Sequence, residues 1–88
     1  MKLLVLYRAN SEHSRSVEEF IGYFKQRDSQ TEVELLDVDS VAGSSQAALY
    51  DVVQYPAILA LQTDGSLQKL WQGEQLPLVD EVESYVVA

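Results

Sequence analysis

The sequence predicts a small α/β domain built on a mixed sheet, and three patterns along the chain indicate that fold class. Residues 2–7 (KLLVLY) and 56–62 (PAILALQ) are short, continuous apolar runs, which are typical of central strands covered on both faces. Between them lie a helical stripe and a more polar strand, and a strand, a helix and a second strand form a right-handed parallel crossover. Asp64 and Gly65 then separate the second apolar run from residues 66–72 (SLQKLWQ), which is a strong signal for an antiparallel hairpin. The sheet should therefore contain both parallel and antiparallel strands.

The first helix is expected from about Ser11 to Arg27. Apolar residues recur there with helical spacing, at Val17, Phe20, Ile21 and Phe24. Asn10 or Ser11 can cap the start of the helix with a side-chain oxygen, and Glu12 in the first turn is favoured by the helix dipole. The stripe predicts that this helix packs on one face of the sheet.

The rest of the chain supplies one more strand and two more helices. Residues 33–39 (VELLDVD) are more polar than the central runs and predict an edge strand of the same sheet. Gly43 and Ser44 form a break, after which a short helix is expected at about 45–51. Pro77 suits the first position of a last helix. One face of that helix collects apolar residues: Leu78, Val79, Val82, Tyr85 and Val86.

Composition and charge exclude several classes of function. The chain has 88 residues, enough for one small domain, residues 1–88, and it has no cysteine. The net charge of −8 is uneven: residues 1–27 carry five basic and three acidic side chains, whereas Lys69 alone opposes eleven acidic residues from Asp28 onward. An acidic body argues against nucleic acid as a partner, because phosphate binding requires a basic face, and the excess acid serves solubility or a cationic partner. No apolar run approaches the roughly 18 to 20 residues that a membrane span needs, so we expect a cytoplasmic protein without membrane contact.

Two local segments, together with the element order, resemble the thioredoxin superfamily and in particular its small glutaredoxin-like members. Residues 4–21 (LVLYRANSEHSRSVEEFI) are similar to the family's segment of strand, loop, CxxC motif and helix. Ser11 and Ser14 stand where the two cysteines would be. Residues 52–61 (VVQYPAILAL) are similar to the family's loop into the third strand, where the proline follows a cis peptide bond.

The resemblance implies a three-layer α/β/α sandwich with a four-stranded mixed sheet. The first and last helices would cover one face of the sheet and the middle helix the other. The resemblance also implies a cis peptide bond between Tyr55 and Pro56. The implied spatial order of the strands is 33–39, 2–7, 56–62 and 66–72.

The two serines exclude the family's thiol chemistry. A serine hydroxyl neither ionises usefully near neutral pH nor forms a disulfide, so both dithiol and monothiol reactions are ruled out for this chain. In one interpretation Ser11 caps the helix and Ser14 fills a small polar site near the sheet. In a second, the serines were introduced in place of reactive cysteines. In a third, the helix start with Arg8, His13 and Arg15 around it forms a site for a carboxylate or a phosphate.

His13, the single histidine, is expected in solvent rather than in a catalytic site. Ser11 and His13 are two residues apart, and such residues do not face one another on a helix, which disfavours a Ser–His nucleophile pair. Asp37 and Asp39 are explained by a solvated strand end. No catalytic residue, metal or cofactor is expected.

The resemblance further implies a ligand groove beside the proline loop. Its residues would be Arg8, Ser11, Glu12, His13, Ser14, Tyr55, Pro56 and Gly73. In the family, the backbone that precedes the cis proline pairs with an extended peptide or with glutathione. The expected function is therefore that of a redox-inactive module that binds a protein or peptide, as a monomer or weak dimer. Two alternatives stay open: a noncovalent binder of glutathione or a small anion, such as an enzyme subunit, and a Cys-to-Ser form of a thiol–disulfide oxidoreductase.

Overall fold

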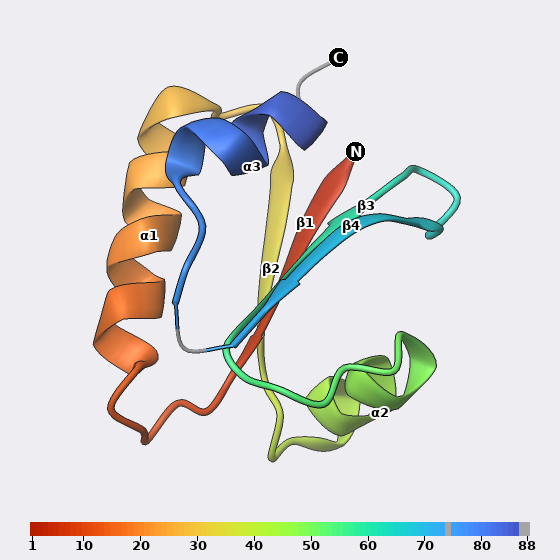
Figure 1. Cartoon of the computed structure of the whole chain (residues 1–88). Coiled ribbons are helices and arrows are strands. Elements are labelled where there is room, and N and C mark those ends of the chain that lie inside the picture. Colours follow the sequence, from red (N-terminus) through yellow and green to blue (C-terminus); the bar gives the residue numbers. More distant parts are fainter. Residues whose placement is uncertain (74, 87–88) are drawn as a thin grey trace.

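The computed structural model describes residues 1–73 and 75–86, and within them it contains seven elements in the predicted order (Figure 1). Their bounds are β1 (Lys2–Tyr7), α1 (Ser14–Arg27), β2 (Glu32–Asp37), α2 (Val41–Leu49), β3 (Ala57–Leu61), β4 (Leu67–Gln72) and α3 (Val79–Val86).

The four strands form one sheet in the order β2, β1, β3, β4. β1 and β2 run parallel, with Lys2 opposite Glu32 and Tyr7 opposite Asp37. β3 runs antiparallel to both of its neighbours, β1 and β4. The predicted mixed sheet and the predicted spatial order of its strands are thus confirmed.

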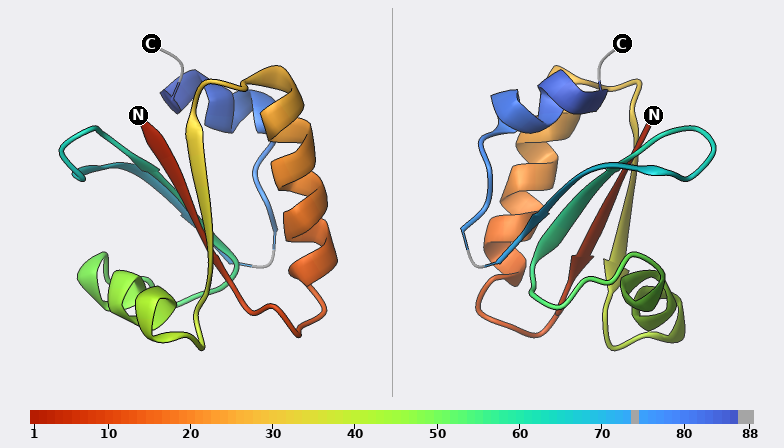
Figure 2. Two further views of the ribbon diagram at one scale, coloured as in Figure 1. Left: turned by 180° about the vertical axis from the view of Figure 1, so that it is seen from behind. Right: turned by 45° about the vertical axis from the view of Figure 1, so that its right-hand side comes forward.

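Helices cover the sheet on both sides, with α1 and α3 on one face and α2 on the other (Figures 1 and 2). Side chains alternate across a strand, and β1 follows this rule. Leu3, Val5 and Tyr7 belong to the core beneath α1 and α3, whereas Leu4 and Leu6 belong to the core beneath α2. β3 is likewise buried at all five positions. The two continuous apolar runs are therefore central strands, as their composition predicts.

α1 begins three residues later than the sequence predicts, and its cap differs from the expected one. The helix starts at Ser14, and His13 occupies the N-cap position without a side-chain cap hydrogen bond. Ser11 does not cap it, because the Ser11 hydroxyl donates to the carbonyl of Arg8 instead. Glu12 lies before the helix rather than in its first turn. The expected stripe is confirmed: Val17, Phe20, Ile21 and Phe24 are buried.

α2 begins before the predicted break. Ser40 caps this helix: its hydroxyl oxygen accepts from the N–H of Gly43 at 3.0 Å. Gly43 is buried inside the helix, where a Cβ would lie 1.9 Å from the carbonyl oxygen of Asp37. The expectation of a break at Gly43 was therefore wrong, because this glycine lets the helix approach the end of β2 closely.

The last helix starts at Val79, two residues after Pro77. Leu78 therefore lies outside it and is 75% exposed, although the sequence pattern placed Leu78 on the apolar face. Val82 and Val86 are buried as expected. β2 ends at Asp37, two residues earlier than predicted.

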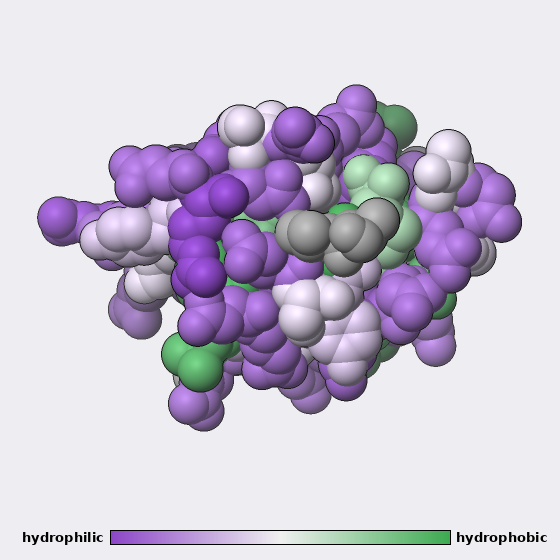
Figure 3. All heavy atoms as spheres, turned by 90° about the horizontal axis from the view of Figure 1, so that it is seen from above, coloured by the Kyte–Doolittle hydropathy of each residue, from purple (hydrophilic) through white to green (hydrophobic). Residues whose placement is uncertain are grey.

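Much of the surface is hydrophilic, in keeping with the net charge of −8. Seen from the end of the molecule at which α3 and the N-terminus lie, hydrophobic areas are small and separate (Figure 3). Among the helices of residues 1–73 and 75–86, none combines the length and the apolar character required to cross a membrane.

Candidate functional site

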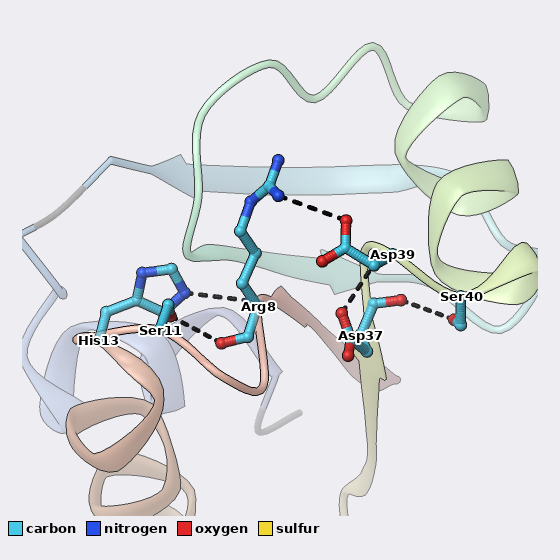
Figure 4. Close-up of polar contacts among 6 residues, drawn as sticks. All are labelled: Arg8, Ser11, His13, Asp37, Asp39 and Ser40. Carbon is cyan, nitrogen blue, oxygen red and sulfur yellow. Dashed lines mark hydrogen bonds and ion pairs between the residues drawn. The ribbon is translucent and has the colours of Figure 1, made fainter.

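Arg8 joins three loops at one end of the sheet (Figure 4). It follows β1, and its Nη1 lies 3.3 Å from Oδ1 of Asp39, which follows β2. Its guanidinium carbon also lies 5.8 Å from the ring centre of Tyr55, in the loop before β3. Because both charged side chains are more than half exposed, the ion pair contributes little to stability. The ion pair instead fixes the position of the Arg8 guanidinium, which lies over the Tyr55 ring near the ends of β1 and β2.

The turn between Arg8 and Ser14 is closed by local hydrogen bonds. The Ser11 hydroxyl donates to the Arg8 carbonyl at 2.7 Å, and the Ser14 hydroxyl donates to the Ser11 carbonyl at 3.0 Å. The N–H of Arg8 donates to Nε2 of His13 at 3.1 Å. His13 therefore ties the end of β1 to the start of α1.

These hydrogen bonds determine the roles of Ser11, Ser14 and His13. Ser11 and His13 bind different backbone groups of the same residue, Arg8, and no Ser–His hydrogen bond joins them in the described turn. Both serine hydroxyls donate to carbonyl oxygens, so neither faces a base that could activate it. His13 is half-buried, and its hydrogen bond with Arg8 lies at the exposed surface.

A hollow of about 450 Å³ lies beside this turn and is lined by Arg8, Ser11, Glu12 and His13. The other expected groove residues do not line it. Ser14 begins α1.

Tyr55, Pro56 and Gly73 form the neighbouring backbone rather than the wall of the hollow. The Tyr55–Pro56 peptide bond is cis, and the Pro56 side chain is almost wholly buried. The N–H of Gly73 donates to the Pro56 carbonyl at 3.1 Å, with Gly73 at φ +117°, a conformation that favours glycine. Tyr55 thus lies beside the hollow as a half-buried residue with its ring under the Arg8 guanidinium, whereas the Pro56 side chain is buried.

Asp39 was missed as a site residue, although the sequence held a signal for it. The sequence pattern assigned it, with Asp37, to a solvated strand end. In the structure its carboxylate binds Arg8, and its N–H donates to Oδ1 of Asp37 at 2.9 Å. Opposite charges directly after two adjacent parallel strands lie at the same edge of a sheet, and this placement could have predicted the pair.

In residues 1–73 and 75–86, no three or more His, Asp or Glu side chains are grouped so that they could hold a metal ion. The chemistry open to this end of the sheet is therefore that of its hydrogen-bonding groups and of the Arg8 charge.

The architecture is a thioredoxin-like fold. Thioredoxin 1 from the thermophilic eubacterium Thermosipho africanus superposes with a TM-score of 0.73 at 16% identity, covering 98% of this chain and 90% of that one. The oxidised thioredoxin from Plasmodium falciparum superposes with a TM-score of 0.74 at 14% identity, covering 98% of this chain and 83% of that one. Mitochondrial thioredoxin 3 from Saccharomyces cerevisiae superposes with a TM-score of 0.72 at 17% identity, covering 96% of this chain and 74% of that one. No protein-family model and no curated protein sequence matches the chain.

The chain thus has a thioredoxin-like fold without the sulfur atoms that thiol–disulfide exchange requires. Dithiol and monothiol exchange are excluded for this sequence. The narrower resemblance to glutaredoxins stays a prediction.

Proposed function

We propose that this protein is a redox-inactive thioredoxin-like module that binds an extended peptide in the groove formed by the Arg8–Ser14 turn and the Tyr55–Pro56 loop. The observation that carries the proposal is the state of the Tyr55 backbone. Within the described residues, neither its N–H nor its carbonyl takes part in a hydrogen bond. A backbone that lies beside a sheet and has free donors and acceptors can pair with an added strand.

The Arg8–Ser14 turn supports this proposal because it supplies polar groups next to the free backbone. The hollow of about 450 Å³ gives room for one side chain of a peptide whose backbone runs along Tyr55. Arg8 adds a positive charge above the Tyr55 ring. That charge also favours a second candidate, a small anionic ligand such as glutathione, held without covalent chemistry.

Peptide selection followed by NMR mapping tests the proposal. Blocked hexapeptides selected from a random library against the whole chain should shift the amide signals of Tyr55 and of residues 8–14. Tyr55→Ala should weaken the binding of these peptides about tenfold, because it removes the aromatic wall of the groove. Tyr23→Ala is the matched control, since Tyr23 is 63% exposed on α1.

Glutathione titrated in the same way separates the two candidates. If glutathione shifts residues 8–14 and no selected peptide does, the small-anion function replaces the peptide function. Selected peptides that bind the Tyr55→Ala and Tyr23→Ala variants equally well would contradict the proposed groove.

A further inference from the structure

A second hollow, of about 710 Å³, opens beside β4 and shares no lining residue with the hollow at the Arg8–Ser14 turn. It lies between the strand and the segment that leads into α3. Its apolar wall includes Trp71, Leu76 and Leu78. Leu78 is 75% exposed, so a large apolar side chain stands in water at the rim of this hollow. We name this surface, made by Leu70, Trp71, Gln72, Leu76, Leu78 and Glu81, the β4 hollow.

β4 is an edge strand, and its free side faces the β4 hollow. The N–H of Gly73 donates to the carbonyl of Pro56, which marks a hydrogen-bonded pair of the ladder. Hydrogen-bonded and non-hydrogen-bonded pairs alternate along antiparallel strands. The backbone N–H and carbonyl of Trp71 therefore point toward β3. Leu70 and Gln72 therefore point theirs outward, to the free edge. Both residues belong to the wall of the β4 hollow, which thus combines unpaired strand backbone with an apolar recess.

The charge of the β4 hollow is negative. Among the described residues that line it, Glu81 carries the only charge. The Glu81 Oε2 atom accepts from Trp71 Nε1 at 2.8 Å, which leaves Oε1 able to accept from an ammonium or guanidinium group. Lys69, the one cation of β4, forms no ion pair with Glu81 within the described residues, and its Nζ lies 5.9 Å from the ring centres of both Trp71 and Tyr85.

We infer that the β4 hollow binds an extended segment that carries apolar and basic residues at every second position, so that both face α3, and that this segment adds to β4 as a fifth strand. The apolar side chains would enter the recess beside Trp71 and Leu78, and a basic side chain would pair with Glu81. Long-range electrostatics favour the same occupant, because a net charge of −8 attracts a cationic segment and repels an acidic one. The site is separate from the proposed groove and does not depend on its function.

Trp71 is the only tryptophan of the chain, so its fluorescence reports directly on this site. The probe is a blocked pentapeptide, Val-Ser-Lys-Ser-Val, whose valines and lysine share one face of a strand, titrated into the whole protein at low salt. We expect a saturable change in Trp71 emission that weakens as salt is added. Two comparison peptides separate the contributions: the glutamate–valine peptide, with glutamate in place of lysine, should not bind, and a peptide with serine in place of both valines should bind at least fivefold more weakly, because it lacks the apolar side chains.

Variants then locate the binding. Leu78→Ser should weaken binding of the lysine–valine peptide about fivefold, because it removes an exposed apolar contact without touching the core. Leu49→Ser, at a position that is 68% exposed on α2, is the matched control and should bind like the parent. Glu81→Gln keeps an acceptor for the indole N–H and should remove most of the preference for lysine over glutamate.

Four outcomes would overturn the inference: no saturable change in Trp71 emission, equal binding of the glutamate–valine peptide, equal effects of Leu78→Ser and Leu49→Ser, or an affinity that falls in the Tyr55→Ala variant. The last outcome would place the peptide in the groove instead.

Discussion

The close approach of α2 to the end of β2 predicts opposite effects of the same substitution at two helical glycines. In Gly43→Ala the new Cβ would lie 1.9 Å from the carbonyl oxygen and 2.6 Å from the carbonyl carbon of Asp37. Both are backbone atoms, so no side-chain rotation can relieve the contact. Since real Cβ atoms almost never approach within 3.0 Å, α2 would have to move by at least the difference, 3.0 − 1.9 = 1.1 Å.

That displacement determines the expected loss in the free energy of unfolding. Ala47 of α2 packs against the core that contains Leu4 and Leu6, and a shift of the helix loosens this contact. Overpacking of this kind costs about 1 to 3 kcal/mol, and we expect the upper end because the strain falls on backbone. The gain in helix propensity from glycine to alanine, about 1 kcal/mol, offsets part of it. The net loss should be about 2 kcal/mol, a large fraction of the stability of so small a domain.

Gly22→Ala is the matched control. Gly22 lies inside α1, and a Cβ there would meet no atom within 4 Å. Only the propensity term acts, so this variant should be stabilised by about 0.5 to 1 kcal/mol. Urea unfolding followed by far-ultraviolet circular dichroism should move the midpoint down for Gly43→Ala and up for Gly22→Ala. Midpoints that shift in the same direction, or a Gly43→Ala variant as stable as the parent, would refute the steric reasoning.

Three further predictions concern other local contacts. Ser40→Ala removes the cap of α2 and should lower the unfolding free energy by about 1 kcal/mol, which urea titration checks; no change would mean that the Ser40 hydroxyl does not act as a cap. The Thr31 hydroxyl, as the main cause, lowers the pKa of Asp28 below its ordinary value, so the Asp28 charge stabilises the fold above about pH 3.9 and the benefit is lost as pH falls through the lowered pKa. Asp28→Asn should therefore unfold at lower urea than the parent at pH 7, and this difference should shrink as pH falls below about 3.9; a difference that does not shrink would speak against this assignment. Ser11→Cys combined with Ser14→Cys should form an internal disulfide on oxidation, seen as protection of both thiols from alkylation, and full alkylation as in the single variants would show that these positions do not correspond to a CxxC pair.

The sheet could be predicted from the sequence because its central strands depend on local composition. Leu3 to Leu6 and Ala57 to Leu61 are apolar at every position, and a short run of that kind fits a strand covered on both faces. The parallel crossover and the hairpin then follow from chain order and from the Asp64–Gly65 turn. Tertiary structure did not have to be known for any of these steps.

The helix starts could not be predicted in the same way, since contacts outside each helix decide them. The Ser11 region carries the usual cap residues, but the hydrogen bond between the Arg8 N–H and His13 holds it as a separate turn. Gly43 has the composition of a break, yet the nearby Asp37 carbonyl makes it a position of close packing. At both positions the local sequence was compatible with two structures, and a contact outside the helix determined which one formed.

Most residues of the site were predicted from the sequence, but the contacts between them were not. Arg8, His13 and Tyr55 were expected in one region, and the structure places Arg8 against both of the others. The ion pair with Asp39 spans 31 positions in the sequence and has no local signature. Exposure of Leu78 was missed for a simpler reason: the periodic pattern includes this residue, but α3 begins one residue later.

Ser11 and Ser14 stabilise the Arg8–Ser14 turn without supplying a reactive thiol. Each hydroxyl donates a hydrogen bond to a carbonyl of the turn, a bond that a thiol makes only weakly, so Ser11 and Ser14 hold the Arg8–Ser14 turn at least as firmly as cysteines would. The core beneath α1 does not include either residue, and its packing is therefore independent of the exchange. A surface that keeps its turn, its Arg8 charge and the free backbone of Tyr55 keeps the groups that noncovalent binding uses. The absence of cysteine excludes thiol exchange, and it gives no physical reason to exclude noncovalent binding.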